Sequence, residues 1–380
     1  MDDDFDLSRW RDIIVLPDQA ARADALARQE QLTKPSGALG RLEDVSVWLA
    51  GVTGRCPPPP ITHPALAIFA GDHGVAHTAG TSAYPPEVTA QMVANFVAGG
   101  AAATVLARGQ NVAVRIVDVS VDVDWSASVL PVPDHVTADR VRAGSGSIDR
   151  EDAMTREQSL SGLRLGARVA DELINAGADL LIAGDMGIGN TTPAAALIGL
   201  LADAEPARVV GRGTGIDDNT WMRKTAAVRD AMRRGRPLKG DPVALLATCG
   251  GPDLAATTGF LLQAAARRTP VLLDGVISCA CALVAHRVAF RASHWWLASH
   301  RSTEPAATAA LDRLGLVPLL DLGMRLGEGS GALIALPLVT SAGDLLREMA
   351  TFASSGVSDR AEPEDADGPD DQGPEETSPA

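Results

Sequence analysis

Apolar and polar residues alternate with two different periods along the chain, and the period predicts which segments are strands and which are helices. Short apolar runs bounded by turn residues predict buried strands, at 65–70, 112–119, 179–183 and 270–273, with 293–299 as the last candidate. Longer segments with helical spacing predict helices, at about 39–50, 87–108, 155–176, 254–266 and 276–285.

Strands that alternate with helices predict an α/β protein with a Rossmann-like, mostly parallel sheet flanked by helices. Two segments outside this alternation are helical, an N-terminal arm at 1–31 and a closing helix at 340–353. We expect them to pair as a smaller domain. The predicted division is a large α/β nucleotide-binding domain at 61–299 and a small helical domain built from 1–60 and 300–355.

The length of the chain and its net charge restrict the number of domains and the classes of partner that we expect. A chain of 380 residues with 46% hydrophobic residues is long enough for one large domain and a smaller one. The formal net charge of −15 argues against a nucleic-acid partner, which needs a basic face. Val357 to Ala380 holds nine acidic residues and one Arg, so we predict a disordered acidic tail at 356–380.

The chain also lacks the usual signals for membranes and secretion. We find no uninterrupted apolar run that approaches the roughly 20 residues of a membrane span. The start, Met1-Asp2-Asp3-Asp4, is acidic, unlike a signal peptide. The four cysteines have no spacing typical of zinc sites or disulfides; they are Cys56, Cys249, Cys279 and Cys281. A cytoplasmic protein with reduced thiols is the expectation.

A glycine-rich loop between a predicted strand and a predicted helix is the most specific local signal. Residues 184–192 read Gly-Asp-Met-Gly-Ile-Gly-Asn-Thr-Thr, and Pro193 suits the first helical turn. Asn190, Thr191 or Thr192 can cap that helix, and helix N-termini bind anions. The loop lacks both the P-loop lysine and the G-x-G-x-x-G pattern. It is interpreted as a phosphate cradle, with an ordinary tight turn as the alternative.

A single carboxylate stands among three glycines near the C-terminal end. Residues 325–331 read Arg-Leu-Gly-Glu-Gly-Ser-Gly, and an apolar run at 332–339 follows. Glycine lets the backbone approach a ligand closely. Burial would raise the pKa of Glu328 above about 4.3, which suits a general base. The alternative is a solvated glutamate in a turn before a helix.

Other polar residues follow predicted strands, where open α/β sheets bind ligands. Asp72 and His73 could suggest a metal site, but a third ligand at suitable spacing is missing, and no metal is predicted. Tyr84, the only tyrosine, either lines a pocket or packs at a helix start. Lys224 either reaches a phosphate or lies on the solvated surface. Asp274 either binds ribose hydroxyls or caps a helix.

These motifs together resemble the nicotinate-nucleotide–dimethylbenzimidazole phosphoribosyltransferase family of cobalamin nucleotide-loop synthesis. The matching stretches are 34–43 (Lys-Pro-Ser-Gly-Ala-Leu-Gly-Arg-Leu-Glu), 72–75, 187–196, 272–275 and 324–331. The resemblance spans about 10–355 and excludes the acidic tail. It implies transfer of ribose phosphate from nicotinate mononucleotide to dimethylbenzimidazole, with no metal, no tightly bound cofactor and usually a homodimer.

The resemblance also implies roles for particular residues. Glu328 matches the family's catalytic base, Lys224 its phosphate-side lysine and Asp274 its ribose-side aspartate. The benzimidazole pocket matches the segment from Tyr84 to Met92. The phosphate loop matches Gly187, Gly189, Asn190, Thr191 and Thr192. Asp185 is a candidate substrate-binding residue that stands where the best-known members are expected to have Glu; its side chain is one methylene shorter, which leaves a direct contact with the nucleotide open.

Two other functions are compatible with the same pattern. A dehydrogenase on a similar sheet would bind a nicotinamide dinucleotide tightly, and the missing G-x-G-x-x-G counts against it. A nucleotide sensor that uses the acidic tail for its partner would bind nucleotide without turnover. The acceptor base cannot be read from the pocket segment, because benzimidazoles and purines differ by few contacts.

Overall fold

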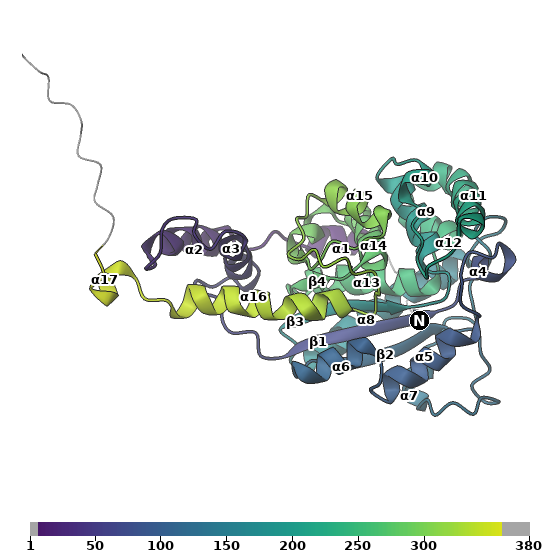
Figure 1. Ribbon diagram of the computed structural model, residues 1–380, viewed down its shortest axis with the longest axis horizontal. Coiled ribbons are helices and arrows are strands. Elements are labelled where there is room, and N and C mark those ends of the chain that lie inside the picture. Colours follow the sequence, from purple (N-terminus) through teal and green to yellow (C-terminus); the bar gives the residue numbers. More distant parts are fainter. Residues whose placement is uncertain (1–6, 359–380) are drawn as a thin grey trace, which may run out of the picture.

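The computed structural model describes residues 7–358 and contains one parallel sheet. The acidic start and nearly all of the acidic tail predicted at 356–380 lie outside the described residues. The strand order is β2-β1-β3-β4-β5 (Figure 1), which confirms the α/β class. The strands are β1 (Pro64–Gly71), β2 (Ala113–Ser120), β3 (Leu180–Met186), β4 (Val271–Leu273) and β5 (Trp296–Ala298).

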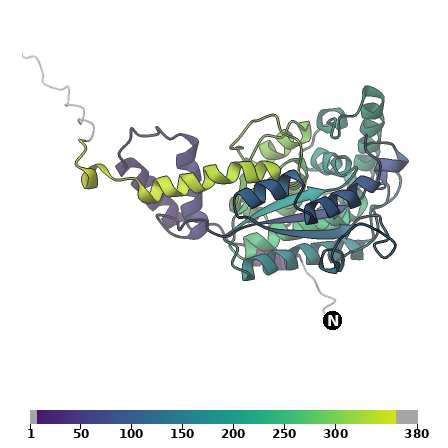
Figure 2. The same ribbon diagram turned by 60° about the horizontal axis from the view of Figure 1, so that its bottom comes forward.

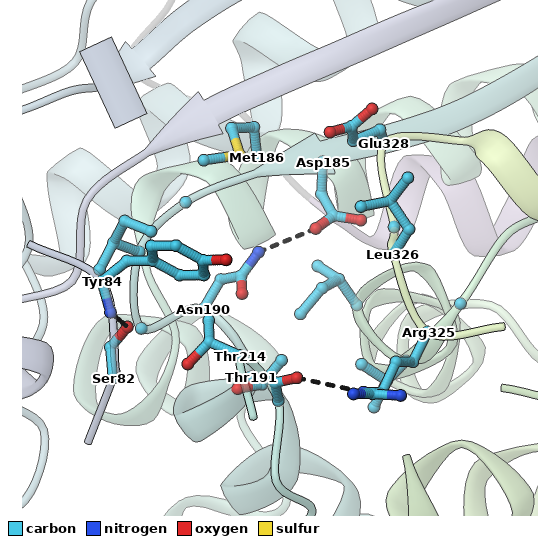
Figure 3. Close-up of a pocket in the computed structure, with 18 of the residues that line it drawn as sticks. Ser82, Tyr84, Asp185, Met186, Asn190, Thr191, Thr214, Arg325, Leu326 and Glu328 are labelled. Atoms are coloured by element: carbon cyan, nitrogen blue, oxygen red, sulfur yellow. Dashed lines mark hydrogen bonds between the residues drawn. The ribbon is translucent and has the colours of Figure 1, made fainter. Parts of the chain in front are cut away.

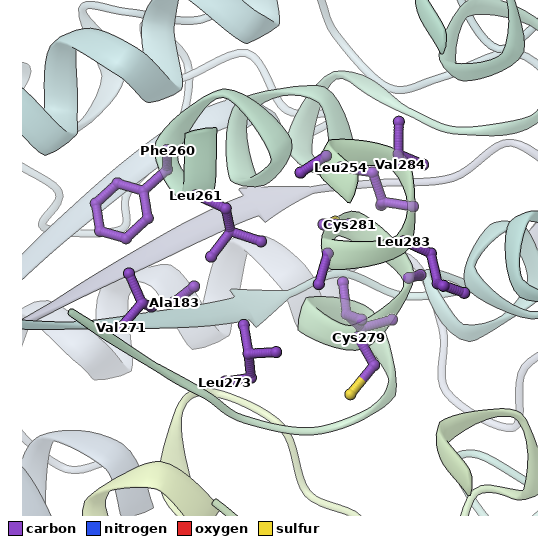
Figure 4. Close-up of a cluster of buried hydrophobic side chains, with 14 of the residues drawn as sticks. Ala183, Leu254, Phe260, Leu261, Val271, Leu273, Cys279, Cys281, Leu283 and Val284 are labelled. Atoms are coloured by element: carbon purple, nitrogen blue, oxygen red, sulfur yellow. The ribbon is translucent and has the colours of Figure 1, made fainter. Parts of the chain in front are cut away.

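Both faces of the sheet are covered, and strand β1 is accordingly apolar throughout. Every residue of β1 is buried, and parallel sheets with helices on both faces show such continuous apolar runs. α13 (Pro252–Ala266) and α14 (Val276–Val288) cover one face, and Figure 4 shows their side chains packed over β3 and β4. Phe69 and Phe260 meet there edge to face, with ring centroids 5.5 Å apart.

The other face carries α5 (Glu87–Val97), α6 (Ala102–Gly109) and the first half of α16 (Ser330–Glu348) (Figure 2). The remaining helices of the large unit surround this sandwich. They are α4 (Val75–Thr78), α7 (Asp134–Thr137), α8 (Arg156–Asn175), α9 (Thr191–Leu201), α10 (Pro206–Val209), α11 (Asp218–Gly235) and α12 (Pro242–Cys249). α8 can pack closely on α13 because Gly166 has no Cβ; a Cβ there would lie only 1.7 Å from the Ala256 carbonyl oxygen.

Several predicted helices have different bounds in the structure. The helix predicted at 87–108 is divided into α5 and α6, because Gly99 has a φ of +76°, which a helix does not continue. By length and composition alone, residues 87–109 would suffice to cross a membrane, although Gln91, Asn95 and Arg108 interrupt the apolar run. In the fold, Val93 and Phe96 of this stretch are buried in the protein core.

The closing helix begins at Ser330 and not at about 340, because the apolar run after Glu328 is itself helical. Pro337 lies inside this helix and has no N–H for the carbonyl of Leu333. The side-chain amide of Gln110 donates to that carbonyl at 2.8 Å, so the lost hydrogen bond is replaced. The strand predicted at 293–299 is shorter too, because a 3₁₀-helix takes up Phe290–Trp295.

A smaller helical lobe lies beyond the sheet, at the left of Figure 1. It consists of α2 (Gln19–Gln31), α3 (Arg41–Thr53), the second half of α16 and α17 (Phe352–Ser355). We predicted that 1–60 and 300–355 form this domain. Within those ranges, α1 (Ser8–Ile13) and α15 (Pro305–Leu314) pack instead on helices of the large unit. The indole Nε1 of Trp10, for example, donates to Gln263 on α13 at 2.9 Å.

Candidate active site

A pocket of about 650 Å³ opens at the carboxyl ends of the strands. Strand order reverses between β1 and β3, and ligands of open α/β sheets bind at such switch points. The lining segments converge from distant parts of the chain, as Figure 3 shows. Within the segment from Thr81 to Met92, five residues line the pocket: Thr81, Ser82, Tyr84, Val88 and Met92. The other lining residues are Asp185 to Thr191, Gly213, Thr214, Gly275 to Ile277, Ser302, and Arg325 to Glu328.

The glycine-rich loop forms one wall and leads into α9. A Cβ at Gly187 would lie 2.0 Å from the Gly71 carbonyl oxygen, and Gly189 has a φ of +92°, so both positions require glycine. Asn190 is the N-cap residue of α9, but its side chain donates to Asp185 Oδ2 at 2.8 Å. Gly189, Asn190 and Thr191 line the pocket. The N-terminal end of α9 therefore offers an anion site.

Two buried polar residues support this loop from behind. Thr89 Oγ1 accepts a hydrogen bond from the Ile188 N–H at 3.0 Å and donates to Asp72 Oδ1 at 2.5 Å. His73 turns the other way and pairs with Asp253 Oδ2 at 3.0 Å. The side chains of Asp72 and His73 therefore have different hydrogen-bond partners. Within residues 7–358, no group of three or more His, Cys, Asp or Glu is arranged to hold a metal ion.

Lys224 of α11 lies behind the pocket wall. Its side chain is 1% exposed, and Nζ donates to Thr191 Oγ1 at 2.7 Å and to the Gly211 carbonyl oxygen at 3.3 Å. Burial lowers the pKa of Lys224, and the charge of Glu304 opposes that shift. The alternative of a solvated surface lysine is therefore wrong.

Glu304 is a residue that sequence reasoning missed. It is buried, and Oε1 accepts the Gly213 N–H at 2.7 Å, which holds the loop between α10 and α11 against Lys224. The only sequence signal was Glu304-Pro305, a helix start. A helix start is ordinarily solvated, so nothing local indicated a buried carboxylate.

Glu328 occupies the opposite end of the pocket in an unusual backbone conformation. Its φ is +64°, between Gly327 at +85° and Gly329 at +86°. The residue is 4% exposed, so it is no solvated turn glutamate, and Oε2 accepts the Ala103 N–H at 3.3 Å. Burial raises the pKa of Glu328, the Ala103 hydrogen bond lowers it and the charge of Asp274 raises it further.

Asp274 holds the backbone beside Glu328. Its carboxylate accepts N–H groups from Gly329 (3.1 Å), Gly331 (2.8 Å) and Ala332 (3.1 Å), at the start of α16. Burial raises the pKa of Asp274, and His300 and these N–H groups lower it. The carboxylate lies outside the pocket lining. Asp274 therefore caps α16, which is distant in sequence. The predicted contact of Asp274 with the ribose stays a prediction.

Asp185 lines the pocket next to the Glu328 loop, where a Cβ at Gly327 would be 3.3 Å from its carboxylate oxygens. One carboxylate oxygen accepts from Asn190, and the other is buried with no hydrogen-bond partner among the described residues. Burial raises the pKa of Asp185 well above its ordinary value, and the charges of Asp274, Asp253 and Glu328 add to the shift. A hydroxyl-bearing ligand would supply the missing partner.

The predicted site residues thus fall into two groups. The structure brings eight of them to one pocket: Tyr84, Met92, Asp185, Gly187, Gly189, Asn190, Thr191 and Glu328. Thr192, Lys224 and Asp274 lie behind it; Thr192 is fully buried and donates to Thr81 Oγ1 at 3.2 Å. Lining residues with no predicted role include Ser82, Thr214, Ser302, Arg325 and Leu326.

A switch-point pocket with an anion site at one end and buried carboxylates at the other defines an α/β enzyme for phosphorylated small molecules. A family model described as phosphoribosyltransferase matches residues 14–357. The chain therefore belongs to the phosphoribosyltransferase family that this model describes, as its relatives also indicate.

Two curated relatives and one solved structure carry the same enzyme name. The chain is 58% identical over 343 residues to nicotinate-nucleotide–dimethylbenzimidazole phosphoribosyltransferase of Mycobacterium avium (strain 104), covering 90% of this chain and 96% of that protein. Its Mycobacterium tuberculosis (strain ATCC 25618 / H37Rv) counterpart is 56% identical over 363 residues, with 96% and 98% covered. The crystal structure of the Thermus thermophilus enzyme matches with a TM-score of 0.83 and 41% identity, over 90% of this chain and all of that one.

Proposed function

We propose that this protein transfers the ribose phosphate of nicotinate mononucleotide to dimethylbenzimidazole, giving α-ribazole phosphate and nicotinate for the cobalamin lower ligand. One observation carries the proposal. The same pocket has a helix N-terminus backed by Lys224 at one end and the buried Glu328 at the other. The names of the relatives agree with this activity.

The chemistry requires few protein groups. Nicotinate leaves without protonation, because its ring nitrogen loses a positive charge as the glycosidic bond breaks. The ribosyl centre becomes oxocarbenium-like, so positioning and electrostatic stabilisation dominate. Attack by the neutral acceptor nitrogen from the opposite face converts a β-linked nucleotide into an α-linked product. No covalent enzyme intermediate is required.

Glu328 is the proposed general base. The acceptor's second ring nitrogen carries a proton that becomes acidic as the new bond forms, and a carboxylate within hydrogen-bond reach can take it. The raised pKa of Glu328 makes it a better proton acceptor than an exposed glutamate. The acceptor ring would lie against Tyr84, Val88 and Met92, which line the pocket from the start of α5.

A homodimer is part of the same proposal. Large apolar side chains are exposed on the segment that leads to the catalytic loop, namely Val317 (59%), Leu322 (60%) and Leu326 (56%). Leu326 also lines the pocket, so an interface here would lie beside the site. Light scattering coupled to gel filtration tests this, and a monomeric mass at micromolar concentration would contradict it.

A direct assay tests the reaction. The purified protein is incubated with nicotinate mononucleotide and dimethylbenzimidazole, and products are separated by chromatography. Equal amounts of nicotinate and α-ribazole phosphate are expected. Nicotinate alone would indicate a hydrolase, and omitting the acceptor would then leave its release unchanged. Bound nucleotide without any product would favour a different acceptor or a sensor, and tight binding of a nicotinamide dinucleotide would favour a dehydrogenase.

Replacing Lys224 by Met tests the anion end of the pocket. The KM for nicotinate mononucleotide should rise about tenfold, because the buried ammonium attracts the phosphate from behind the wall and fixes the Thr191 hydroxyl that lines the pocket. Met also leaves Thr191 Oγ1 and the Gly211 carbonyl without their donor, so the melting temperature is measured in parallel.

Lys239→Met is the matched control, since Lys239 pairs with Asp203 away from the pocket lining. It should leave the KM unchanged. A Lys224→Met protein that melts earlier but keeps the wild-type KM would show that Lys224 is only structural.

A further inference from the structure

Arg325 is the one cation among the side chains that line the pocket, all of which belong to the described part of the chain. We propose that Arg325 binds the substrate's phosphate from the open side, opposite Lys224, and makes the site select a nucleotide over the corresponding nucleoside. This inference rests on the proposed transferase function and assigns a phosphate contact to a residue that has had none.

The position of Arg325 is defined through Gly213. Arg325 Nε donates to the Gly213 carbonyl oxygen at 3.3 Å. A Cβ built on Gly213 would lie 3.1 Å from Thr191 Oγ1 and 3.2 Å from Lys224 Nζ. Gly213 therefore lies between Lys224, which is outside the pocket lining, and Arg325, which lines the pocket. Figure 3 shows the Arg325 guanidinium at the Thr191 and Thr214 end of the pocket.

The guanidinium has donors left for a ligand. Its Nε is used by Gly213, and no other hydrogen bond of Arg325 is formed within residues 7–358. The two Nη groups form a planar fork that matches two phosphate oxygens. Because Arg325 is exposed, this fork can turn onto a bound phosphate without losing a buried contact.

Charge along the pocket determines which end takes the phosphate. Glu328 lies at the other end, and Asp185 lies between the two ends, bonded to Asn190 on one side and 3.3 Å from a Cβ built on Gly327 on the other. A phosphate dianion is repelled by these carboxylates and attracted to Arg325 and Lys224. The phosphate consequently binds at the Gly213 end, and the reacting ribose carbon lies toward Glu328.

Lys224 alone would leave the phosphate without a cation on the open side of the pocket. The ammonium is 1% exposed and already donates to Thr191 and Gly211, so it acts from behind the wall. A phosphate seated on the α9 N-terminus would still present oxygens to the pocket mouth. Arg325 is the side chain placed to cover them, and Arg gives a bidentate geometry that Lys cannot.

Arg212 provides a matched control from the same loop. It is also exposed, but it donates to the Ile216 carbonyl oxygen at 2.8 Å and pairs with Asp218. It does not line the pocket. Arg212→Met and Arg325→Met therefore remove the same charge and the same side chain, one outside the pocket and one inside it.

The experiment compares two donors in each protein, nicotinate mononucleotide and its nucleoside, nicotinate riboside. Arg325→Met should raise the KM for the nucleotide about 10- to 100-fold. Its constants for the riboside should stay near those of wild type, and Arg212→Met should resemble wild type for both donors. Arg325→Lys should recover part of the loss, since it restores charge but not the fork.

Equal losses for both donors would overturn the proposal, because the riboside keeps the nicotinate carboxylate and lacks only the phosphate. An unchanged nucleotide KM in Arg325→Met would overturn it as well. A circular-dichroism spectrum and a melting temperature for each variant exclude misfolding as the cause.

A binding measurement separates this inference from the transferase proposal. Inorganic phosphate at millimolar concentration should raise the melting temperature of the wild type and of Arg212→Met, and raise that of Arg325→Met much less. This comparison needs no turnover, so it tests Arg325 even if the wild type shows no transfer. Equal stabilisation of all three proteins, or none in the wild type, would contradict a phosphate site at Arg325.

Discussion

Glu328→Gln should lower kcat by about 10²- to 10⁴-fold while nucleotide binding stays near wild type, because general-base catalysis contributes a factor of that size. Gln keeps the shape of the side chain and can still accept the Ala103 N–H through its amide oxygen. The loop with its three consecutive positive φ angles is therefore preserved, and only the proton acceptor is lost. Single-turnover rates and nucleotide titrations measure the two effects separately.

The pH dependence of kcat/KM provides a second test that Glu328 is the general base. The ionised form of Glu328 is the active one, and burial raises its pKa above the ordinary glutamate value. The wild-type kcat/KM should therefore fall on the acid side as the pH drops through that raised pKa, and this limb should be missing in Glu328→Gln.

Glu157→Gln, in the exposed first turn of α8, is the matched control and should change neither kcat nor the profile. Should Glu328→Gln keep near-wild-type kcat, the base is another group, and Asp185 would be the next to replace.

Asp274→Asn should reduce both stability and turnover. An Asn can keep its oxygen toward Gly331 and Ala332, but its amide nitrogen then faces the Gly329 N–H, and two donors oppose each other. An unsatisfied buried donor costs about 1–3 kcal/mol, so the free energy of unfolding should fall by about that amount. Gly329 follows Glu328 directly, so kcat should fall about tenfold or more through loss of positioning.

Asp241→Asn is a matched control, because Asp241 caps α12 through the Ala244 N–H without contacting the catalytic loop. It should keep kcat and change the free energy of unfolding only slightly, because Asn caps a helix about as well as Asp. Urea unfolding and steady-state kinetics give both quantities. If Asp274→Asn instead raises the nucleotide KM at unchanged stability, Asp274 contacts the ribose, as the family resemblance implied.

Much of the fold was accessible from the chain because apolar periodicity is a local property. The runs around β1 and β3 are apolar since both faces of a parallel sheet are buried, and turn residues bound them. The errors have equally local causes. Gly99 ends α5 where hydrophobicity alone continued the helix, and Gln110 makes Pro337 tolerable inside α16.

The sequence by itself determined the α/β class, the glycine-rich loop at the start of α9 and the carboxylate among glycines at Glu328. Each of these three features depends on residues that are neighbours in sequence, so the residue types and their spacing are enough to predict it. The tertiary structure alone decided which polar groups face the pocket. Asp274 bonds to N–H groups 55 to 58 residues away, and the burial of Glu304 and the reach of Lys224 depend on helices that pack from distant segments. Such contacts follow from strand order and packing, and no local pattern encodes them.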